Sequence, residues 1–599
     1  MHPSLLLLLL ILLPLSAASS LPHHHSDFTK SRLRRSSEPP REYVEIARPL
    51  STDSLTPSCT LQILSHSFGN CSAYRAPTNT TYSHPLNCRW SRAVLHLSAA
   101  ANGSQRDRIA AVWLSGAEIL RTSPPESTSN EAVWNVRKDV TRYSSLLRKS
   151  NLTLSVMLEN VVNGVYHLNL TVLFYDVATN ETAVSVNSPL SLFSPNRKAM
   201  IRELGELQPV SIPENYSLEM DENPADLIIP ISASGEEGFW FKIQSQHDAI
   251  YHGIKIPPNT YRAVIEVYAS FHGYDEFWYS NLPDSYIQLN HLPTKRGNGA
   301  YREVVVRIDN NVAGSLIPFP VIYAGGINPL FWEPLVSIGA FDIPSYEIEL
   351  TPFLGTLLDE KVHYLGLGVS DALSFWLVDA NLHLWLDTKV DKVQAGVISP
   401  GDPSKSEIER ESKFQQLDGK FEVEGTRKIE VSGWVNSSAG NITTIVTSKV
   451  KLENEIKLKS NGTVKDIDHE VKMTSKVTLK SDAGQIISYV EVEKKYPLEM
   501  TITSLPGSGS DDYLMITKLE NSMEEERKNG TFKSSLTNTQ KSNGWMFVED
   551  CNVISGASST HQTYEIKDSF GCYSRDVLAE DGSIKSDTEY LVCAVVAAS

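Results

Sequence analysis

Short stretches in which apolar and polar residues alternate recur along almost the whole chain, and no long stretch has helical periodicity. In residues 166–174 every even position is apolar, and in residues 449–459 most even positions are apolar and oppose Lys and Glu. A period of two places neighbouring side chains on opposite faces of a strand. The pattern therefore predicts an all-β protein whose antiparallel sheets each bury one face.

Changes in composition divide the 599 residues into five segments. Residues 1–20 have the leucine run and small-residue ending of a cleaved signal peptide. Residues 21–51 are expected to be a polar leader or a disordered segment, in which RLRRSS is either a basic processing site or a chance group of arginines. Residues 52–195 and 205–393 are two β-rich blocks that suit sandwiches or jelly rolls. Residues 394–599, rich in Lys, Glu, Ser and Thr, are expected to form a separate C-terminal antiparallel β domain.

The signal-peptide pattern predicts a secreted protein, or one in the lumen of the secretory pathway or of a vacuole- or lysosome-like compartment. No later segment approaches the run of about 18 apolar residues that spans a bilayer, so we expect no membrane association. Asn-X-Ser/Thr sequons fit the same route and occur at Asn70, Asn79, Asn102, Asn151, Asn169, Asn180, Asn215, Asn436, Asn441, Asn461 and Asn529. Alternation places Asn151 and Asn169 on the solvent face of their strands.

The cysteines form two groups of three, Cys59, Cys71 and Cys88 near the start and Cys551, Cys572 and Cys593 near the end. In an oxidising compartment we expect disulfides, whose pairing the sequence does not determine. If all six are paired, at least one bridge joins the two groups; otherwise each group leaves a free thiol.

Charge and motif spacing exclude several classes of ligand. The net charge is −17 and no basic stripe is present, which argues against a nucleic-acid partner. No CxxC or HExxH spacing indicates a metal site. We therefore expect no metal ion and no cofactor.

Three acidic residues stand in apolar or aromatic surroundings. Asp107, beside Arg108, opens the apolar run of QRDRIAAVWLSG. Glu159 directly follows the alternating strand NLTLSVML, and Glu276 lies among aromatic residues in YASFHGYDEFWYSN. Desolvation and neighbouring charges shift the pKa of such carboxyls, as acid–base chemistry requires. For any one of them alone, a salt-bridged or solvated acid at a strand end is the commoner explanation.

Four segments resemble one known family. They are VWNVRKDVTRYSSLL, NLTLSVMLENVVNGVYHLNLTVLFYD, IKIPPNTYRAVIEVYASFHGYDEFW and NPLFWEP. They resemble the peptide-N-glycosidase amidases, most closely the peptide-N4-(N-acetyl-β-glucosaminyl)asparagine amidase A group and more distantly the bacterial peptide-N-glycosidase F enzymes. The resemblance covers roughly residues 59–387. It implies two adjacent jelly-roll β-sandwiches with an active site in the cleft between them.

The resemblance also implies a reaction. Such a hydrolase cleaves the β-aspartylglucosamine amide of an N-glycopeptide or N-glycoprotein, releases a glycosylamine and converts Asn to Asp. By position, Asp107 matches the primary catalytic Asp, Glu276 the Glu that bonds the core sugar, and Glu159 a supporting Glu that orients water or substrate. Paired carboxylates can activate water and assist the leaving nitrogen. Arg108 would hold a carboxylate or a substrate carbonyl.

Aromatic residues near these acids are candidate sugar-binding surfaces, because pyranose rings have apolar faces. Trp278, Tyr279 and Trp332 are the candidates, although aromatic side chains more often belong to a core. His272 is either a substrate-binding residue or a packed or capping one. The bacterial enzymes carry an arginine near the aromatic turn, whereas INPLFWEPLVSIGAF offers only Glu333.

Two other functions fit the same sequence features. A secreted carbohydrate-binding sandwich would have no turnover, because the fold alone does not determine function. A glycosidase would also use two carboxylates but would cut a C–O bond and leave the asparagine intact. Mass spectrometry of a treated glycopeptide distinguishes an amidase, a glycosidase and a lectin.

Thiol labelling tests the predicted pairing of the two cysteine groups. If every thiol is oxidised, a bridge must join the groups, because three residues cannot pair among themselves. Proteolysis within residues 401–419 should then give two fragments that separate only after reduction. Labelling of two cysteines in the denatured, unreduced protein would contradict such a bridge.

Overall fold

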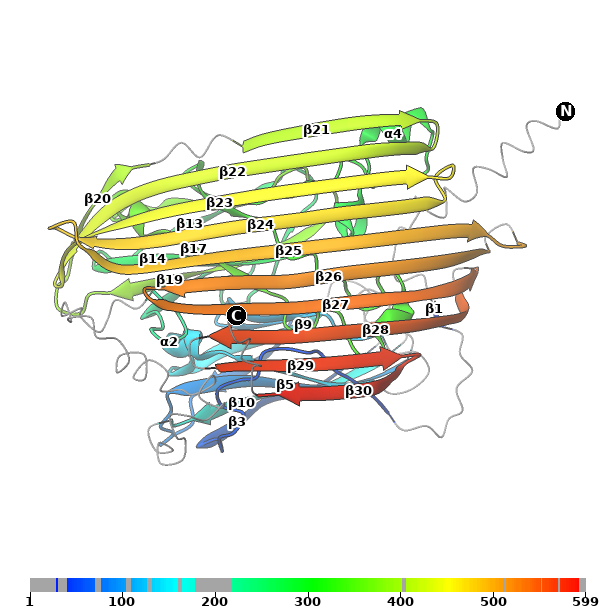
Figure 1. The fold of residues 1–599 in the computed structure, drawn as a ribbon. Coiled ribbons are helices and arrows are strands. Elements are labelled where there is room, and N and C mark those ends of the chain that lie inside the picture. The colour runs from blue at the N-terminus through cyan, green and yellow to red at the C-terminus, as the bar shows by residue number, and fades with distance from the viewer. Residues whose placement is uncertain are drawn as a thin grey trace, which may run out of the picture.

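Two β-sandwiches followed by one large sheet form the molecule (Figure 1). The computed structural model describes residues 29–30, 40–69, 77–103, 109–126, 132–159, 164–177, 218–400, 406–509, 512–550, 552–568 and 571–591. The all-β class and the antiparallel C-terminal region are confirmed. Among the described residues, no helix has both the length and the apolar character that a membrane crossing needs.

The first sandwich packs a five-stranded sheet against a four-stranded one. The five-stranded sheet has the order β2 (Arg41–Tyr43), β8 (Ala132–Asp139), β5 (Arg92–Gly103), β10 (Gly164–Tyr175) and β3 (Cys59–Gly69). The four-stranded sheet has the order β4 (Thr78–Ser83), β9 (Ser150–Leu158), β6 (Ala110–Leu114) and β7 (Ala117–Thr122). Between β8 and β9 lie the 3-10 turn η2 (Thr141–Tyr143) and the short helix α2 (Ser144–Leu147). Buried side chains of both sheets share one core.

Strand β10 shows the alternation that the sequence predicts. Leu168 and Leu170 are buried, whereas His167 and Asn169 are exposed. Among the described sequons, five are exposed, at Asn79, Asn102, Asn151, Asn169 and Asn436, and three are partly exposed, at Asn441, Asn461 and Asn529. The sequons at Asn70, Asn180 and Asn215 lie outside the described residues.

Residues 40–50, which composition assigns to the leader, belong to the folded protein. Strand β2 pairs in parallel with β8, and Val44 forms a bridge with Leu335 of the second sandwich. Tyr43 and Ile46 are buried. Backbone pairing and two buried side chains help to hold this segment, although its composition is polar.

A disulfide joins Cys59, at the start of β3, to Cys88. Cys572, in the C-terminal sheet, is also disulfide-bonded. Cys71, Cys551 and Cys593 lie outside the described residues. A bridge between the two groups of cysteines therefore stays a prediction.

The second sandwich has the same two-sheet plan. One sheet has the order β11 (Leu227–Ile231), β19 (Trp376–Leu386), β14 (Thr260–Phe271) and β17 (Ser345–Glu349), with β12 (Phe241–Ile243) also paired to β19. The other has the order β13 (Ala249–Ile254), β18 (His363–Val369), β15 (Val304–Ile308) and β16 (Asn311–Leu316). Its short helices and 3-10 turns are η5 (Gly235–Glu237), η6 (Gly273–Asp275), η7 (Trp278–Ser280), α4 (Asp284–Leu289), η8 (Pro329–Trp332), η9 (Thr351–Phe353) and α5 (Leu354–Leu357).

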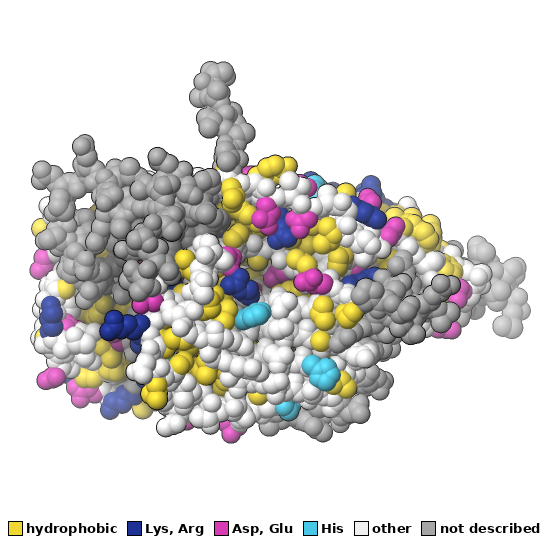
Figure 2. All heavy atoms as spheres, turned by 90° about the horizontal axis from the view of Figure 1, so that it is seen from below, with side chains coloured by type: hydrophobic (Ala, Val, Ile, Leu, Met, Phe, Trp, Pro, Cys, Tyr) yellow, Lys and Arg dark blue, Asp and Glu magenta, His cyan; other side chains and the backbone are white. Residues whose placement is uncertain are grey.

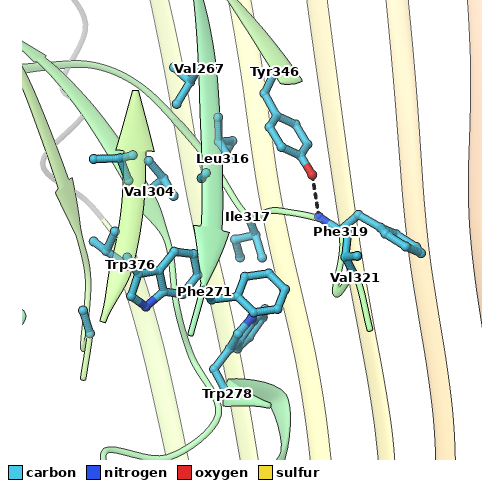
Figure 3. Close-up of a cluster of buried hydrophobic side chains, with 14 of the residues drawn as sticks. Val267, Phe271, Trp278, Val304, Leu316, Ile317, Phe319, Val321, Tyr346 and Trp376 are labelled. Atoms are coloured by element: carbon cyan, nitrogen blue, oxygen red, sulfur yellow. Dashed lines mark hydrogen bonds between the residues drawn. The ribbon is translucent and has the colours of Figure 1, made fainter. Parts of the chain in front are cut away.

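Aromatic and branched side chains fill the core of the second sandwich (Figure 3). Phe271 lies between two tryptophans in this cluster, and its ring centroid is 5.3 Å from that of Trp376. The Tyr346 hydroxyl accepts a hydrogen bond of 2.7 Å from the Phe319 backbone N–H, as the dashed line marks. A buried tyrosine requires such a partner for its polar end.

Strand β19 is buried on both faces, because its polar face packs against the first sandwich. Asp379 accepts a hydrogen bond of 2.7 Å from the Trp113 indole N–H. Asn381 accepts a hydrogen bond of 3.1 Å from the backbone N–H of Glu118 and donates one of 2.8 Å to the Glu118 carbonyl oxygen. Burial, followed by the charge of Glu118, raises the pKa of Asp379 well above its usual value. The alternation of β19 thus separates two buried environments.

The β6–β7 hairpin brings the first sandwich into this contact. Its turn residues, Ser115 and Gly116, have φ values of 51° and 83°, the left-handed conformation of two-residue hairpin turns that match strand twist. A Cβ on Gly116 would lie 2.2 Å from the carbonyl oxygen of Gly235 in η5. Glycine is therefore required for the two sandwiches to approach at this point.

Arg121 of β7 is fully buried at the boundary between the sandwiches. Its Nε and Nη2 atoms each donate 2.7 Å to a carboxylate oxygen of Glu118, which is also fully buried. Its Nη1 atom donates 3.1 Å to Ser270 Oγ and 2.8 Å to the Leu377 carbonyl oxygen, both in the second sandwich. One arginine thus connects the carboxylate of one sandwich to two strands of the other.

Glu266 of β14 carries a second charged contact across the same boundary. The Tyr143 hydroxyl donates to it at 2.8 Å and Arg142 Nη1 donates at 3.1 Å, both from the first sandwich. Burial disfavours the charged form, but the hydrogen bond from His383 and the charge of Arg142 outweigh it and hold the pKa of Glu266 below its usual range. The carboxylate is therefore stabilised by residues of both sandwiches.

The C-terminal region is one antiparallel sheet of long strands that lies across both sandwiches (Figure 1). Its order is β20 (Gln394–Ser399), β22 (Asp418–Ser437), β23 (Gly440–Lys459), β24 (Val464–Ser481), β25 (Ile486–Pro506), β26 (Tyr513–Asn529), β27 (Phe532–Glu549), β28 (Asn552–Asp568), β29 (Gly571–Glu580) and β30 (Ser583–Tyr590). In addition, β21 (Ser406–Gln415) pairs with β22, and β1 (Thr29–Lys30) pairs in parallel with β28.

The two faces of this sheet differ, as the alternation in residues 449–459 predicts. Leu452 and Ile456 are buried in the same core as the second sandwich. Lys451 and Glu453 lie on the other face and form a half-exposed ion pair. Exposed pairs of this kind contribute little to stability, so the apolar inner face accounts for the docking of the sheet. Figure 2 views the molecule from below the orientation of Figure 1, and on that side basic and acidic side chains are interspersed.

We expect Arg121→Met to lower the stability of the whole protein sharply. The substitution leaves Glu118 charged and buried without its guanidinium partner, and breaking a buried pair in this way costs about 3–5 kcal/mol. Denaturant unfolding followed by tryptophan fluorescence measures the loss. The double variant Glu118→Leu/Arg121→Met should lose less than the single variant, because no charge is stranded.

The matched control for this prediction is Lys361→Met, at the exposed Lys361–Asp359 pair. It should leave the unfolding midpoint almost unchanged. A single Arg121 variant as stable as the control would mean that the buried pair does not hold the boundary.

Candidate active site

Glu159 lies at the end of β9, where the first sandwich meets the second. β9 pairs with β6, and the Glu159 backbone N–H donates 3.0 Å to the carbonyl oxygen of Ile109. Ile109 follows Asp107 by two residues in the chain. Asp107 and Arg108 themselves lie outside the described residues. Strand pairing therefore places Glu159 next to the residue where the Asp107 segment enters β6.

The carboxyl group of Glu159 has the electrostatic setting of an acid–base residue. The residue is 6% exposed. Burial raises its pKa, and the positive charge of Lys242 offsets only part of that shift. A carboxyl whose pKa is raised exchanges its proton nearer to neutral pH, which general acid–base chemistry requires.

Lys242 of β12 is a site residue that the sequence analysis did not single out. Its ammonium group lies 3.9 Å from the centroid of the Phe375 ring, a cation–π distance. Its charge also lowers the pKa of both Glu159 and His272. The only signal in the sequence is a lysine inside the apolar and aromatic run 239–243.

His272 follows β14 and is held between two aromatic rings. Tyr323 and Phe375 stack on it with centroid distances of 5.3 and 5.2 Å. Its Nε2 atom is 2.9 Å from Ser270 Oγ, which also accepts from Arg121. Burial first, and then the charges of Arg121 and Lys242, lower the pKa of His272 to about 3. The ring is therefore neutral at neutral pH and can exchange hydrogen bonds but carries no charge.

Glu276 is 4% exposed and follows a turn that Asp275 anchors. Asp275 accepts from Arg302 Nε at 2.8 Å and Nη2 at 2.7 Å, and from the Trp376 indole at 2.7 Å. Asp275 is thus held by two residues of the second sandwich. Burial, followed by the negative charge of Glu276, raises the pKa of Tyr279.

Three predicted sugar-stacking rings are packed inside the protein. Trp278 and Tyr279 are fully buried, and both contact His469 of the C-terminal sheet at 5.1 and 5.9 Å between centroids. Trp332 is 2% exposed and donates 2.8 Å to the Gly326 carbonyl oxygen. None of the three offers an open face to a pyranose in this structure. Their burial corrects the expectation and gives these rings a packing role.

An arginine near the aromatic turn is supplied by a distant segment. Arg41 of β2, which is partly buried, forms an ion pair with the buried Glu333, and the Tyr43 hydroxyl lies 3.5 Å from the same carboxylate. Local sequence reasoning missed Arg41 because composition assigns its segment to the leader.

The structure connects several of the predicted residues through shared neighbours. The charge of Lys242 lowers the pKa of both Glu159 and His272. Tyr323 stacks on His272, and burial together with the charge of Glu276 raises the pKa of Tyr323. These groups come from both sandwiches, and among them Glu159, whose pKa is raised, suits acid–base chemistry on a polar substrate. Among the described residues, no group of three or more His, Cys, Asp and Glu side chains is arranged to hold a metal ion.

Comparison with known proteins covers most of the chain. Residues 47–403 match the family model of peptide N-acetyl-β-D-glucosaminyl asparaginase amidase A, and residues 420–498 match the PNGase A C-terminal domain. The chain is 38% identical over 559 residues to the peptide-N4-(N-acetyl-β-glucosaminyl)asparagine amidase A of Prunus dulcis, covering 92% of each.

Two solved structures show a weaker likeness. PNGase F, a glycosylasparaginase from Flavobacterium meningosepticum, is 13% identical with a TM-score of 0.32, covering 55% of this chain and 96% of that one. PNGF-II is 10% identical with a TM-score of 0.33, covering 55% of this chain and 66% of that one. The family assignment rests on the two sequence matches: the chain belongs to the peptide N-acetyl-β-D-glucosaminyl asparaginase amidase A family.

Proposed function

We propose that this chain hydrolyses the β-aspartylglucosamine amide that joins an N-glycan to asparagine in a glycopeptide or glycoprotein. The observation that carries the proposal is the 38% identity to the Prunus dulcis amidase A across 92% of both chains. The site geometry agrees with an amidase, because a buried carboxyl with a raised pKa, Glu159, lies beside the strand that Asp107 precedes.

The reaction adds one water across the amide. The carbonyl carbon gains the water's hydroxyl group, the C–N bond breaks, and the nitrogen leaves with the sugar as a glycosylamine. The asparagine side chain becomes the carboxyl group of aspartate. A carboxylate must remove a proton from the water, and a proton must reach the leaving nitrogen. We assign the primary role to Asp107, sugar contact to Glu276, and orientation of water or substrate to Glu159.

The surroundings support this division of roles. Lys242 lowers the pKa that burial raises in Glu159, which favours the ionised carboxylate that can accept a hydrogen bond from water. His272 is neutral and fixed by stacking, so it can orient a polar group without adding charge. Arg108 is assigned to a substrate carbonyl or carboxylate.

We further propose that the protein acts in the secretory pathway or outside the cell. The Cys59–Cys88 disulfide is typical of an oxidising compartment. The exposed sequons at Asn151 and Asn169 can carry glycans without disturbing the core. Fractionation of cells that express the tagged protein tests this location.

Asp107→Asn should nearly abolish turnover while folding and glycopeptide binding stay close to wild type. The change removes charge without changing volume, and an acid–base group typically contributes about 10²–10⁴ in rate. Mass spectrometry of a defined glycopeptide is the assay, because an amidase leaves aspartate at the former sequon. Asp53→Asn, at a half-exposed surface pair with Arg137, is the matched control.

Two outcomes would count against this assignment. Activity of Asp107→Asn within about tenfold of wild type would remove Asp107 from the primary role. A product that keeps asparagine would point to a glycosidase, and an unchanged glycopeptide would point to a lectin.

Lys242→Met should move the acid limb of the pH–activity profile to higher pH. The lysine charge lowers the pKa of Glu159, so its removal raises that pKa, and a higher pH is needed to ionise the carboxyl. The measurement is kcat/KM against pH at low salt. Lys242→Arg keeps the charge and should keep the limb in place. An unchanged or downward-shifted limb in Lys242→Met would contradict the role given to Glu159.

A further inference from the structure

The C-terminal sheet forms hydrogen bonds to the turn η7 (Trp278–Ser280), which follows Glu276 in the chain. Asn454 of β23 donates 2.9 Å from Nδ2 to the Tyr279 carbonyl oxygen. Lys465 of β24 donates 2.7 Å from Nζ to the Ser280 carbonyl oxygen. Two neighbouring strands of one sheet thus bind two consecutive carbonyls of η7.

Packing alone does not explain Lys465. Lys465 lies on the inner face of β24 in line with the buried apolar residues Ile467 and Val471. It is itself only 5% exposed, although its side chain is basic. Within the described part of the structure, Ser280 is its only hydrogen-bond partner and no carboxylate pairs with it. Burial, and then the charge of Arg296, lower its pKa to about 7. An amine in such a place costs solvation energy, which its contact with the turn partly offsets.

His469 adds a third contact from the same face. Its Nδ1 atom accepts from Asn454 Nδ2 at 3.1 Å, and its ring meets Trp278 edge-on with centroids 5.1 Å apart. Burial lowers the pKa of His469 to about 3, so the ring is neutral. Trp278 is in turn packed near Phe271 in the core of the second sandwich (Figure 3).

Glu276 therefore lies between two anchored points. On its N-terminal side, Arg302 binds Asp275 within the second sandwich. On its C-terminal side, the donors come from the C-terminal sheet, across 175 and 185 residues of sequence. Removal of either donor would take away one of the two hydrogen bonds that the C-terminal sheet makes to this turn.

We propose that the C-terminal sheet is a positioning element of the active site, in which Asn454 and Lys465 hold residues 278–280 so that Glu276 keeps its orientation towards the substrate. The inference rests on the proposed function, in which Glu276 contacts the core sugar. Asn454 and Lys465 act through the turn and touch no reacting atom.

Hydrogen exchange tests the positioning step without using activity. In Asn454→Leu and Lys465→Met, the amides of residues 273–281 should exchange faster than in wild type under conditions where both variants are folded. The matched control is Gln540→Met, which removes a buried amide that donates 3.0 Å from the same sheet to the carbonyl oxygen of Val336. It should leave exchange in residues 273–281 unchanged. Unchanged exchange in both test variants would overturn the proposal.

Kinetics test whether the positioning matters for catalysis. Asn454→Leu and Lys465→Met should lower kcat/KM about tenfold to a hundredfold, the usual effect of a small misplacement, whereas Gln540→Met should not. In a Glu276→Gln background the same substitutions should cause no further loss, because they act through Glu276. Lys465→Arg, which keeps a donor, should recover part of the rate. Losses below about twofold, or losses that add fully to that of Glu276→Gln, would refute the proposal.

Failure of the two proposals can be told apart. If the wild-type protein does not convert asparagine to aspartate, the proposed function fails, and the exchange measurement still decides whether the sheet holds the turn. If the wild type is active and Glu276→Gln is as active as wild type, Glu276 has no role in the reaction and the positioning proposal is overturned.

Discussion

Buried charge shared between the two sandwiches is the constraint on which the rest of the structure depends. The Arg121–Glu118 pair reaches into the second sandwich, and Glu266 is bound by Arg142 and Tyr143 of the first. A shift of one sandwich against the other would leave these charges buried without partners, which is costly. Arg121 also bonds Ser270, the hydroxyl beside His272. The same contact therefore fixes the boundary and orients a residue of the candidate site.

The sequence predicts strands well wherever one face of a sheet meets water. Strand β10 and residues 449–459 follow their alternation because one side chain in two is solvated. It predicts less at β19, where Asp379 and Asn381 belong to a polar face that is nevertheless buried. Their partners come from another sandwich, and a local pattern does not show that neighbour. Composition assigns the segment around Tyr43 to the leader for the same reason.

For the candidate site, the sequence singles out the acids but not the residues that surround them. Glu159 and Glu276 stand out because carboxylates beside strands and aromatic residues are unusual in a local window. Lys242, Asn454 and Lys465 do not stand out, because their contacts are made with residues far away in the chain. The aromatic residues around Glu276 suit a sugar surface or a core equally well by composition. The C-terminal sheet, which covers Trp278, decides between the two in the structure.

The consecutive hairpins of the C-terminal sheet have a consequence for the order of events during synthesis. From β22 to β30 each strand pairs with the next, so most contacts in this sheet are local and can form rapidly. The sandwiches emerge first and domains generally fold in that order, but the turn after Glu276 meets Asn454 and Lys465 only when β23 and β24 have been made. On the positioning proposal, a nascent chain that has made only the strands of the two sandwiches would still lack an ordered sugar contact. The proposed glycan release would then begin only after β23 and β24 have been added to the fold.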